Sequence, residues 1–93
     1  MSEAAKVVSR TSRDMIRCAA RNLGWQKVPS RFPLCDNYTH KGHKLTVYFD
    51  ITGRCRPGGI AYPASGLYEP TFVNNRIAAL RILKDWRVWR RRP

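Results

Sequence analysis

Two histidines, His40 and His43, lie three residues apart in the basic segment "THKGHKLTVYFDITGR". Imidazole has an unperturbed pKa near neutrality, so a pair of histidines can supply the base and the acid that metal-free cleavage of RNA requires. Lys41 and Lys44 flank the histidines and can neutralise negative charge that develops on a phosphate. Three roles stay open for His43: catalysis, contact with a phosphate or a base, and a structural role at the start of a strand.

A metal site is a second interpretation of this segment. The ligands available are Cys35, His40, His43 and Cys55, but the spacing C-x4-H-x2-H is not usual for zinc. The acidic residues occur singly, and the chain has no phosphate-binding loop and no dinucleotide fingerprint. We therefore expect no metal ion and no cofactor. The odd number of cysteines, three, indicates reduced thiols in a reducing compartment.

The net charge of +12 at pH 7, from 18 Lys and Arg against 6 Asp and Glu, predicts an anionic partner. Nucleic acid is the commonest such partner, and an acidic protein or an anionic membrane surface are the alternatives. No apolar run approaches the roughly 20 residues that span a bilayer. The N-terminus also lacks the apolar core of a secretory signal. We therefore expect a cytoplasmic protein that does not act at a membrane.

Two helices are predicted. The first begins at Thr11 or Ser12 and has Gly24 as a left-handed stop. The second begins at Asn74 or Asn75 and frays beyond residue 89. Each helix has one apolar face, made of Met15, Ile16, Ala19, Ala20 and Leu23 in the first and of Ala78, Ala79, Ile82, Leu83, Trp86 and Trp89 in the second.

Three strands are predicted between the helices. Residues 25–28 form a short first strand, and residues 44–51 form a second strand with strict alternation. Residues 54–63 return as a third strand, in which the proline and glycines at 57–59 predict a bulge or a sheet edge. The apolar side of the second strand consists of Leu45, Val47, Phe49 and Ile51.

These elements predict one α+β domain, residues 11–89, between an N-terminal arm, residues 1–10, and a basic C-terminal tail, residues 90–93. The order is α-β-β-β-α, with two helices packed on one face of a three-stranded antiparallel sheet. The connections at residues 29–42 and 64–72 are expected to be loops, the first of them long and irregular.

Basic side chains off the apolar faces of the helices are expected to follow a phosphate backbone. Tyr48, on the polar side of its strand, is the best candidate for stacking on an unpaired base. The sequence Arg-Pro-Gly-Gly at 56–59 can cradle a phosphate, and a bulged strand explains it equally well. The predicted nucleic-acid-binding residues are Arg13, Arg17, Arg21, Lys41, Lys44, Tyr48, Arg54, Arg56, Arg81, Lys84 and Arg87.

Several short motifs together resemble the HicA family of mRNA interferase toxins, and in particular the standalone HicA-like proteins of phages and prophages. The matching residues are Gly24-Trp25, Lys41-Gly42-His43, Tyr62-Pro63-Ala64-Ser65, and Asn75-Arg76 to Leu80-Arg81. The resemblance implies a fold like that of double-stranded-RNA-binding domains, and His43 as the catalytic residue of a metal-independent endoribonuclease. It also implies RNA as the substrate, an antitoxin as a partner, and the host cytoplasm as the location. Gly42 is followed by a single histidine, whereas the family has Gly-Ser-His-His.

Three functions are consistent with these patterns. The first is a small basic protein that binds nucleic acid, with RNA as the expected partner. The second is a HicA-like ribonuclease in which His43 acts with His40 as its second catalytic group. The third is a phage-type inhibitor or host-takeover factor that binds an acidic surface on a host protein. An exposed apolar anchor within the basic surface would favour the third function, and the candidates are Leu67, Tyr68 and Phe72.

Overall fold

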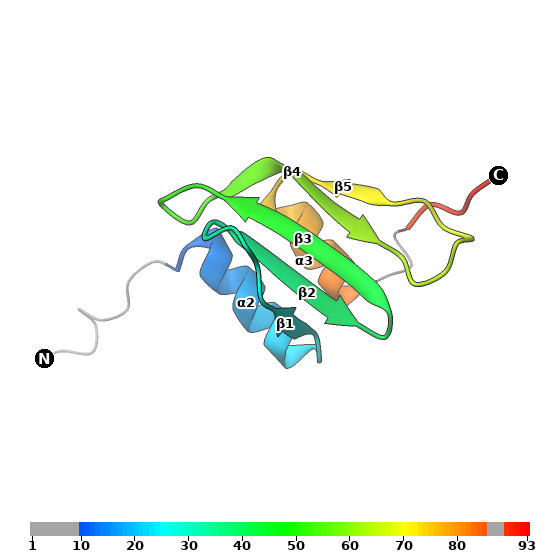
Figure 1. The fold of residues 1–93 in the computed structure, drawn as a ribbon, viewed down its shortest axis with the longest axis horizontal. Coiled ribbons are helices and arrows are strands. Elements are labelled where there is room, and N and C mark those ends of the chain that lie inside the picture. The colour runs from blue at the N-terminus through cyan, green and yellow to red at the C-terminus, as the bar shows by residue number, and fades with distance from the viewer. Residues whose placement is uncertain (1–9, 86–88) are drawn as a thin grey trace, which may run out of the picture.

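The computed structural model describes residues 10–85 and 89–93, in which two helices lie on one face of an antiparallel sheet (Figure 1). The elements are α2 (Ser12–Asn22), β1 (Gln26–Val28), β2 (Cys35–His40), β3 (His43–Phe49), β4 (Cys55–Tyr62), β5 (Thr71–Val73) and α3 (Arg76–Lys84). The sheet has five strands in the order β1-β2-β3-β4-β5, so each strand pairs with its neighbour in the chain. The helices contact each other, and Ile16 of α2 and Ile82 of α3 share one hydrophobic core with the sheet.

The α+β class and the two helices are confirmed, but the predicted α-β-β-β-α order with three strands is wrong. β2 lies in the segment 29–42, which the sequence predicts to be an irregular connection, and β5 overlaps the end of the predicted loop 64–72. β2 has no aliphatic alternation, since Asp36, Tyr38 and His40 form its helix-facing side. β5 has three residues, which are too few to show a period.

α2 begins and ends where the sequence predicts. Thr11 is the N-cap: its hydroxyl accepts a hydrogen bond from the N–H of Asp14, and the Asp14 carboxylate accepts one from the N–H of Thr11. Gly24 has a φ of +86°, a left-handed conformation that ends the helical turn and leads the chain into β1. Ile16 and Ala20 are buried on the predicted apolar face.

β3 supplies the centre of the core. Its buried side chains are Leu45, Val47 and Phe49, as the alternation predicts. Ile51 does not continue this face, because β3 ends at Phe49 and leaves the Ile51 side chain 90% exposed in the following turn. The carboxylate of Asp50 holds that turn by accepting hydrogen bonds from the N–H groups of Thr52 and Arg54.

β4 contains a bulge at residues 57–59, as the sequence predicts. The register between β3 and β4 shifts between Thr46 and Tyr48. A Cβ on Gly59 would lie 2.6 Å from the carbonyl oxygen of Thr46 and 2.7 Å from that of Val73, so only glycine fits there. β4 as a whole is not an edge strand, because it pairs with β3 and with β5, but its register with β5 covers only Gly59, Ile60 and Ala61 and begins after residues 57 and 58.

α3 begins after Asn75, whose side-chain oxygen accepts a hydrogen bond from the N–H of Ala78. Trp89 is buried, but it lies beyond the helix and packs against His43 instead of continuing the helical face. Of the earlier predictions, Trp86, Arg87 and residues 1–9 of the arm lie outside the described residues. In the described part of the chain, no helix has the length and apolarity needed to cross a membrane.

Candidate nucleic-acid interface

A buried carboxylate near the start of β2 gathers basic side chains from α2 and β1. Asp36 is fully buried on the helix-facing side of the sheet. Arg13 donates to both of its oxygens, from Nε to Oδ2 at 3.1 Å and from Nη2 to Oδ1 at 2.8 Å. Arg17 donates from Nε to Oδ2 at 3.1 Å, and the Nζ of Lys27 lies 3.8 Å from Oδ1. The hydroxyl of Tyr38 donates to Oδ2 at 3.2 Å.

The spacing of these residues in the sequence explains how they meet. Arg13 and Arg17 are about one helical turn apart on α2, so both reach the same point on the sheet. Asp36 and Tyr38 are two residues apart on β2 and therefore share a face. Lys27 pairs with Tyr38 across the β1–β2 ladder and so lies on that face as well.

The Asp36 carboxyl group is ionised at neutral pH. Burial by itself raises its pKa, but the hydrogen bonds from Arg13 and Arg17 outweigh the burial and hold the pKa below its usual value. The hydrogen bond to Asp36 raises the pKa of Arg13. Burial, and then the adjacent carboxylate, raise the pKa of Tyr38. Tyr38 is therefore a neutral donor beside a fixed negative charge.

The predicted basic stripe on α2 is divided by this cluster. The Arg13 side chain is 18% exposed, donates to the carbonyl oxygen of Pro33 at 2.9 Å and lies 5.1 Å from the ring centroid of Phe49. Arg13 therefore binds groups of the protein itself and holds α2 to the sheet. Arg17 is half-buried, and Arg21 is exposed.

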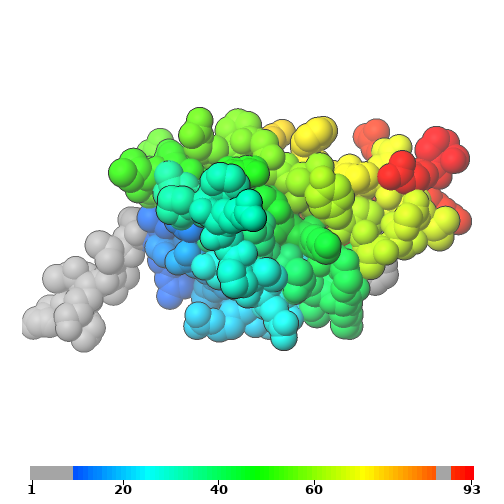
Figure 2. Space-filling view, viewed as in Figure 1, coloured from blue at the N-terminus to red at the C-terminus, as the bar shows by residue number. Residues whose placement is uncertain are grey.

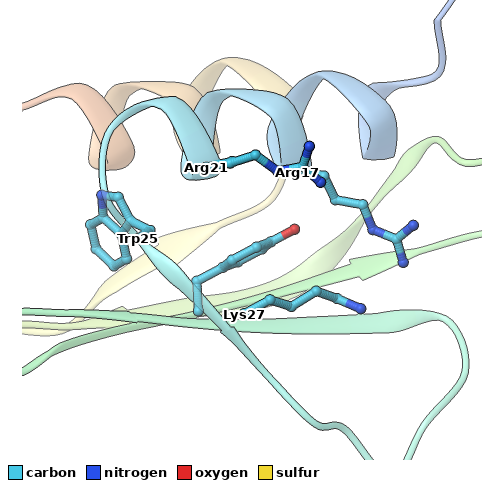
Figure 3. Close-up of a pocket in the computed structure, with 5 residues that line it drawn as sticks. Arg17, Arg21, Trp25 and Lys27 are labelled. Atoms are coloured by element: carbon cyan, nitrogen blue, oxygen red, sulfur yellow. The ribbon is translucent and has the colours of Figure 1, made fainter.

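A hollow of about 350 Å³ lies beside the cluster, between α2 and β1 (Figure 3). Arg17 and Arg21 approach it from the helix, and Lys27 approaches it from the strand. Within residues 10–85 and 89–93, Arg21 has no carboxylate partner. This cationic pocket is lined by Arg17, Arg21, Trp25, Lys27 and Tyr38. The positive charges of its side chains outnumber the negative charge of the nearby Asp36 carboxylate. The pocket therefore suits an anion such as phosphate.

The pocket residues that are not among the predicted binding residues are Trp25, Lys27 and Tyr38. β1 has three residues, and its pairing with β2 decides which of their side chains lie on the helix side of the sheet. Since β2 is not predicted, the sequence gives no signal that Lys27 faces the helix.

His40 and His43 face each other at the end of the β2–β3 hairpin. The two-residue turn Lys41-Gly42 has φ values of +50° and +85°, as a type I′ turn requires. The Nδ1 of His40 lies 3.1 Å from the carbonyl oxygen of Gly24, so this nitrogen carries the proton and donates. The Nδ1 of His43 accepts from the N–H of Ala64 at 2.9 Å, so the proton of neutral His43 is on Nε2. The two rings are therefore held in opposite tautomers.

Aromatic rings surround both histidines. The ring centroids of Trp25 and His40 are 5.3 Å apart, and the ring of His43 meets that of Trp89 edge to face at 4.7 Å. Burial, and then the nearby His40, lower the pKa of His43. His43 is therefore neutral at physiological pH. The catalytic role of both histidines stays a prediction.

The other predicted binding residues are spread over the molecule. The exposed ones are Lys41 and Lys44 at the histidine hairpin, Arg54 and Arg56 at the opposite end of β3, and Arg81 and Lys84 on α3. Tyr48 is half-exposed on the side of the sheet away from the helices, where it pairs with Arg56. Of the predicted residues, Arg13 and Arg17 meet at Asp36. Arg17 and Arg21 line the cationic pocket, and Tyr48 and Arg56 are paired across β3 and β4.

The residues considered for a metal site do not converge. Cys35 and His40 lie at opposite ends of β2 and on opposite faces of it. In the part of the chain that the structure describes, no three His, Cys, Asp or Glu side chains come together as a metal-ligand set.

Comparisons with family models, with curated proteins and with solved structures find no match to this chain. The resemblance to HicA proteins and the likeness to double-stranded-RNA-binding domains therefore stay predictions from the sequence.

Proposed function

We propose that this protein binds nucleic acid and that a backbone phosphate enters the cationic pocket. RNA is the expected class of partner, because the sequence motifs resemble those of HicA proteins. The net charge of +12 favours association with any polyanion, and the pocket gives that charge a place where it is concentrated.

The observation that carries this proposal is the imbalance of charge around Asp36. Arg13, Arg17 and Lys27 all reach this one carboxylate, and Arg21 adds a further cation to the same hollow. A carboxylate that orients guanidinium groups reduces the entropy they lose when a ligand binds. The arrangement therefore combines fixed geometry with surplus positive charge, which phosphate recognition requires.

A HicA-like endoribonuclease is the second candidate, favoured by the opposite tautomers of the two histidines. Neutral His40 has its lone pair at Nε2, where it can accept the proton of a 2′-hydroxyl group. Neutral His43 carries its proton at Nε2, where it can donate a hydrogen bond to an oxygen of the reacting phosphate. A base and a hydrogen-bond donor for the phosphate therefore lie on one hairpin.

An inhibitor of an acidic host protein is the third candidate, favoured by the position of the C-terminal segment. The N–H of Arg92 donates to the carbonyl oxygen of Leu67 at 2.7 Å, and the N–H of Glu69 donates to that of Arg90 at 2.7 Å. This pairing places the exposed side chain of Leu67 beside a basic segment, as an apolar anchor would be. A partner that the protein still captures from nuclease-treated host lysate would favour this candidate over the first.

Titration of labelled RNA at increasing NaCl concentration tests the first proposal. Neutralised phosphates release counterions, so we expect the affinity to fall roughly tenfold or more between about 50 and 200 mM NaCl. An affinity that stays constant over this range would contradict binding through phosphate contacts.

A further inference from the structure

An apolar groove of about 440 Å³ crosses the face of the sheet that the helices leave open. Tyr48 of β3 lies in its middle, since β3 is flanked by β2 and β4. The chain at residues 32–34, just before β2, lines one side, and residues 56–58 of β4 line the other. Figure 2 views this face, and the segment around residues 30–34 stands out from it beside the strands.

The wall at residues 32–34 is held in place although its side chains are exposed. The N–H of Phe32 donates to the hydroxyl of Ser30 at 3.1 Å, and Arg13 donates to the carbonyl oxygen of Pro33 at 2.9 Å. The Phe32 side chain is nevertheless 63% exposed. An exposed aromatic residue on a fixed segment favours binding of a partner, because the segment loses little conformational entropy when the partner binds.

The opposite wall leaves the ring of Tyr48 accessible. A Cβ on Gly58 would lie 3.9 Å from Cδ2 of Tyr48, so a side chain at this position would begin in contact with the ring. Gly58 has a φ of +107°, and its N–H donates to Oδ1 of Asn74 at 3.0 Å. The bulge in β4 therefore places a residue without a side chain beside an aromatic ring.

The charge of the groove indicates the chemistry of its occupant. Arg56 pairs with Tyr48 across the β3–β4 ladder, so its guanidinium group belongs to the same face. The residues that line the groove include this cation and no carboxylate. A planar base on the aromatic ring, with its adjoining phosphate at the guanidinium group, satisfies both features.

We propose that this groove holds an unpaired base of a single-stranded nucleic acid. The inference rests on the proposed nucleic-acid function and adds the class of substrate to it. The groove and the cationic pocket have different tasks: the pocket contacts phosphate in any strand, and the groove contacts a base that is not paired.

Fluorescence anisotropy with two labelled strands tests this inference. One is an oligouridylate of about 12 nucleotides, and the other is an abasic strand of the same length and charge. We expect the wild type to bind the oligouridylate on the order of tenfold more tightly than the abasic strand. Tyr48→Ala should remove this difference, and Tyr48→Phe should keep it. Tyr62→Ala is the matched control, because Tyr62 is an exposed tyrosine on the same face but outside the groove.

Each other outcome overturns the inference in a recognisable way. If the wild type binds both strands equally, phosphate contacts alone account for binding, and the proposed function stands without the groove. If Tyr62→Ala loses the preference as fully as Tyr48→Ala does, the base does not lie in the groove. If neither strand binds at low salt, the proposed function fails as well.

Discussion

The backbone N–H of Ala64 donates to Nδ1 of His43 at 2.9 Å, which joins the segment after β4 to the first residue of β3. The bond requires a lone pair on Nδ1 and therefore exists only with neutral imidazole. It fixes the proton of the neutral ring on Nε2, so His43 presents a hydrogen-bond donor there. It also couples the stability of this end of the sheet to the protonation of one histidine.

Stability is expected to decrease as the pH falls below the unfolded pKa of His43. Burial first, and then His40, place the folded pKa of His43 below the unfolded value of about 6.5. The unfolded state therefore binds more protons between these two values, and the free energy of unfolding falls through that window as the pH is lowered. Urea unfolding measured from about pH 8 to about pH 5 checks this. His43→Gln should remove the dependence in this window, and a wild type that becomes more stable toward pH 5 would contradict it.

The His43→Ala variant separates binding from catalysis. We expect this variant and the wild type to shift labelled RNA equally in a gel and to leave it intact in the presence of EDTA. The reason is that neither the cationic pocket nor the groove includes His43. Cleavage by the wild type alone would instead make the protein a ribonuclease that uses His43.

Replacement of Asp36 by asparagine is expected to destabilise the fold by about 2 kcal/mol. The change leaves Arg13 without its charge partner at a side chain that is 18% exposed, while the more exposed Arg17 and Lys27 can turn to water. The folded pKa of Asp36 is depressed, so its contribution is present above the unfolded pKa of about 3.9 and is lost as the pH falls through the folded value. Unfolding curves for both proteins should therefore converge in strong acid. A variant as stable as the wild type at neutral pH would show that the cluster does not hold α2.

Gly59→Ala is expected to destabilise the protein by about 3 kcal/mol or to prevent folding. The added methyl group would meet carbonyl oxygens of both neighbouring strands, at 2.6 Å and 2.7 Å. Gly66→Ala is the control, since nothing lies within 4 Å of its Cβ position, and it should change stability by less than about 0.5 kcal/mol. Equal melting temperatures for the two variants would refute the close approach at the bulge.

The elements that the sequence predicts correctly are those whose signals are local. Capping by Thr11 and Asn75 and the stop at Gly24 depend on neighbouring residues in the chain, so they can be recognised without the fold. β2 is different, because its helix-facing side carries a charge whose partners come from α2 and β1. Only the tertiary structure makes a buried aspartate at position 36 acceptable in a strand.

The same distinction applies to the candidate sites. Arg17, Arg21 and Tyr48 follow from a basic stripe and from strand alternation, and both patterns can be read in the sequence. Lys27 cannot be identified from such a pattern, because the side of the sheet on which it lies depends on its pairing with β2, a strand that the sequence does not reveal. Phe32 likewise acquires a role only through its position beside Tyr48.

The most direct test of the central claim compares two double variants that remove the same charge. Arg21→Ala/Lys27→Ala removes two cations of the pocket, and Arg90→Ala/Arg92→Ala removes two exposed cations of the C-terminal segment. The measurement is the slope of log K against log salt for single-stranded RNA, with unfolding curves to confirm that both variants fold. We expect the pocket variant to lose about 0.7 from the magnitude of the slope, because one phosphate contact is lost, while the C-terminal variant keeps the wild-type slope. Equal slopes for the two variants would contradict a phosphate site between α2 and β1.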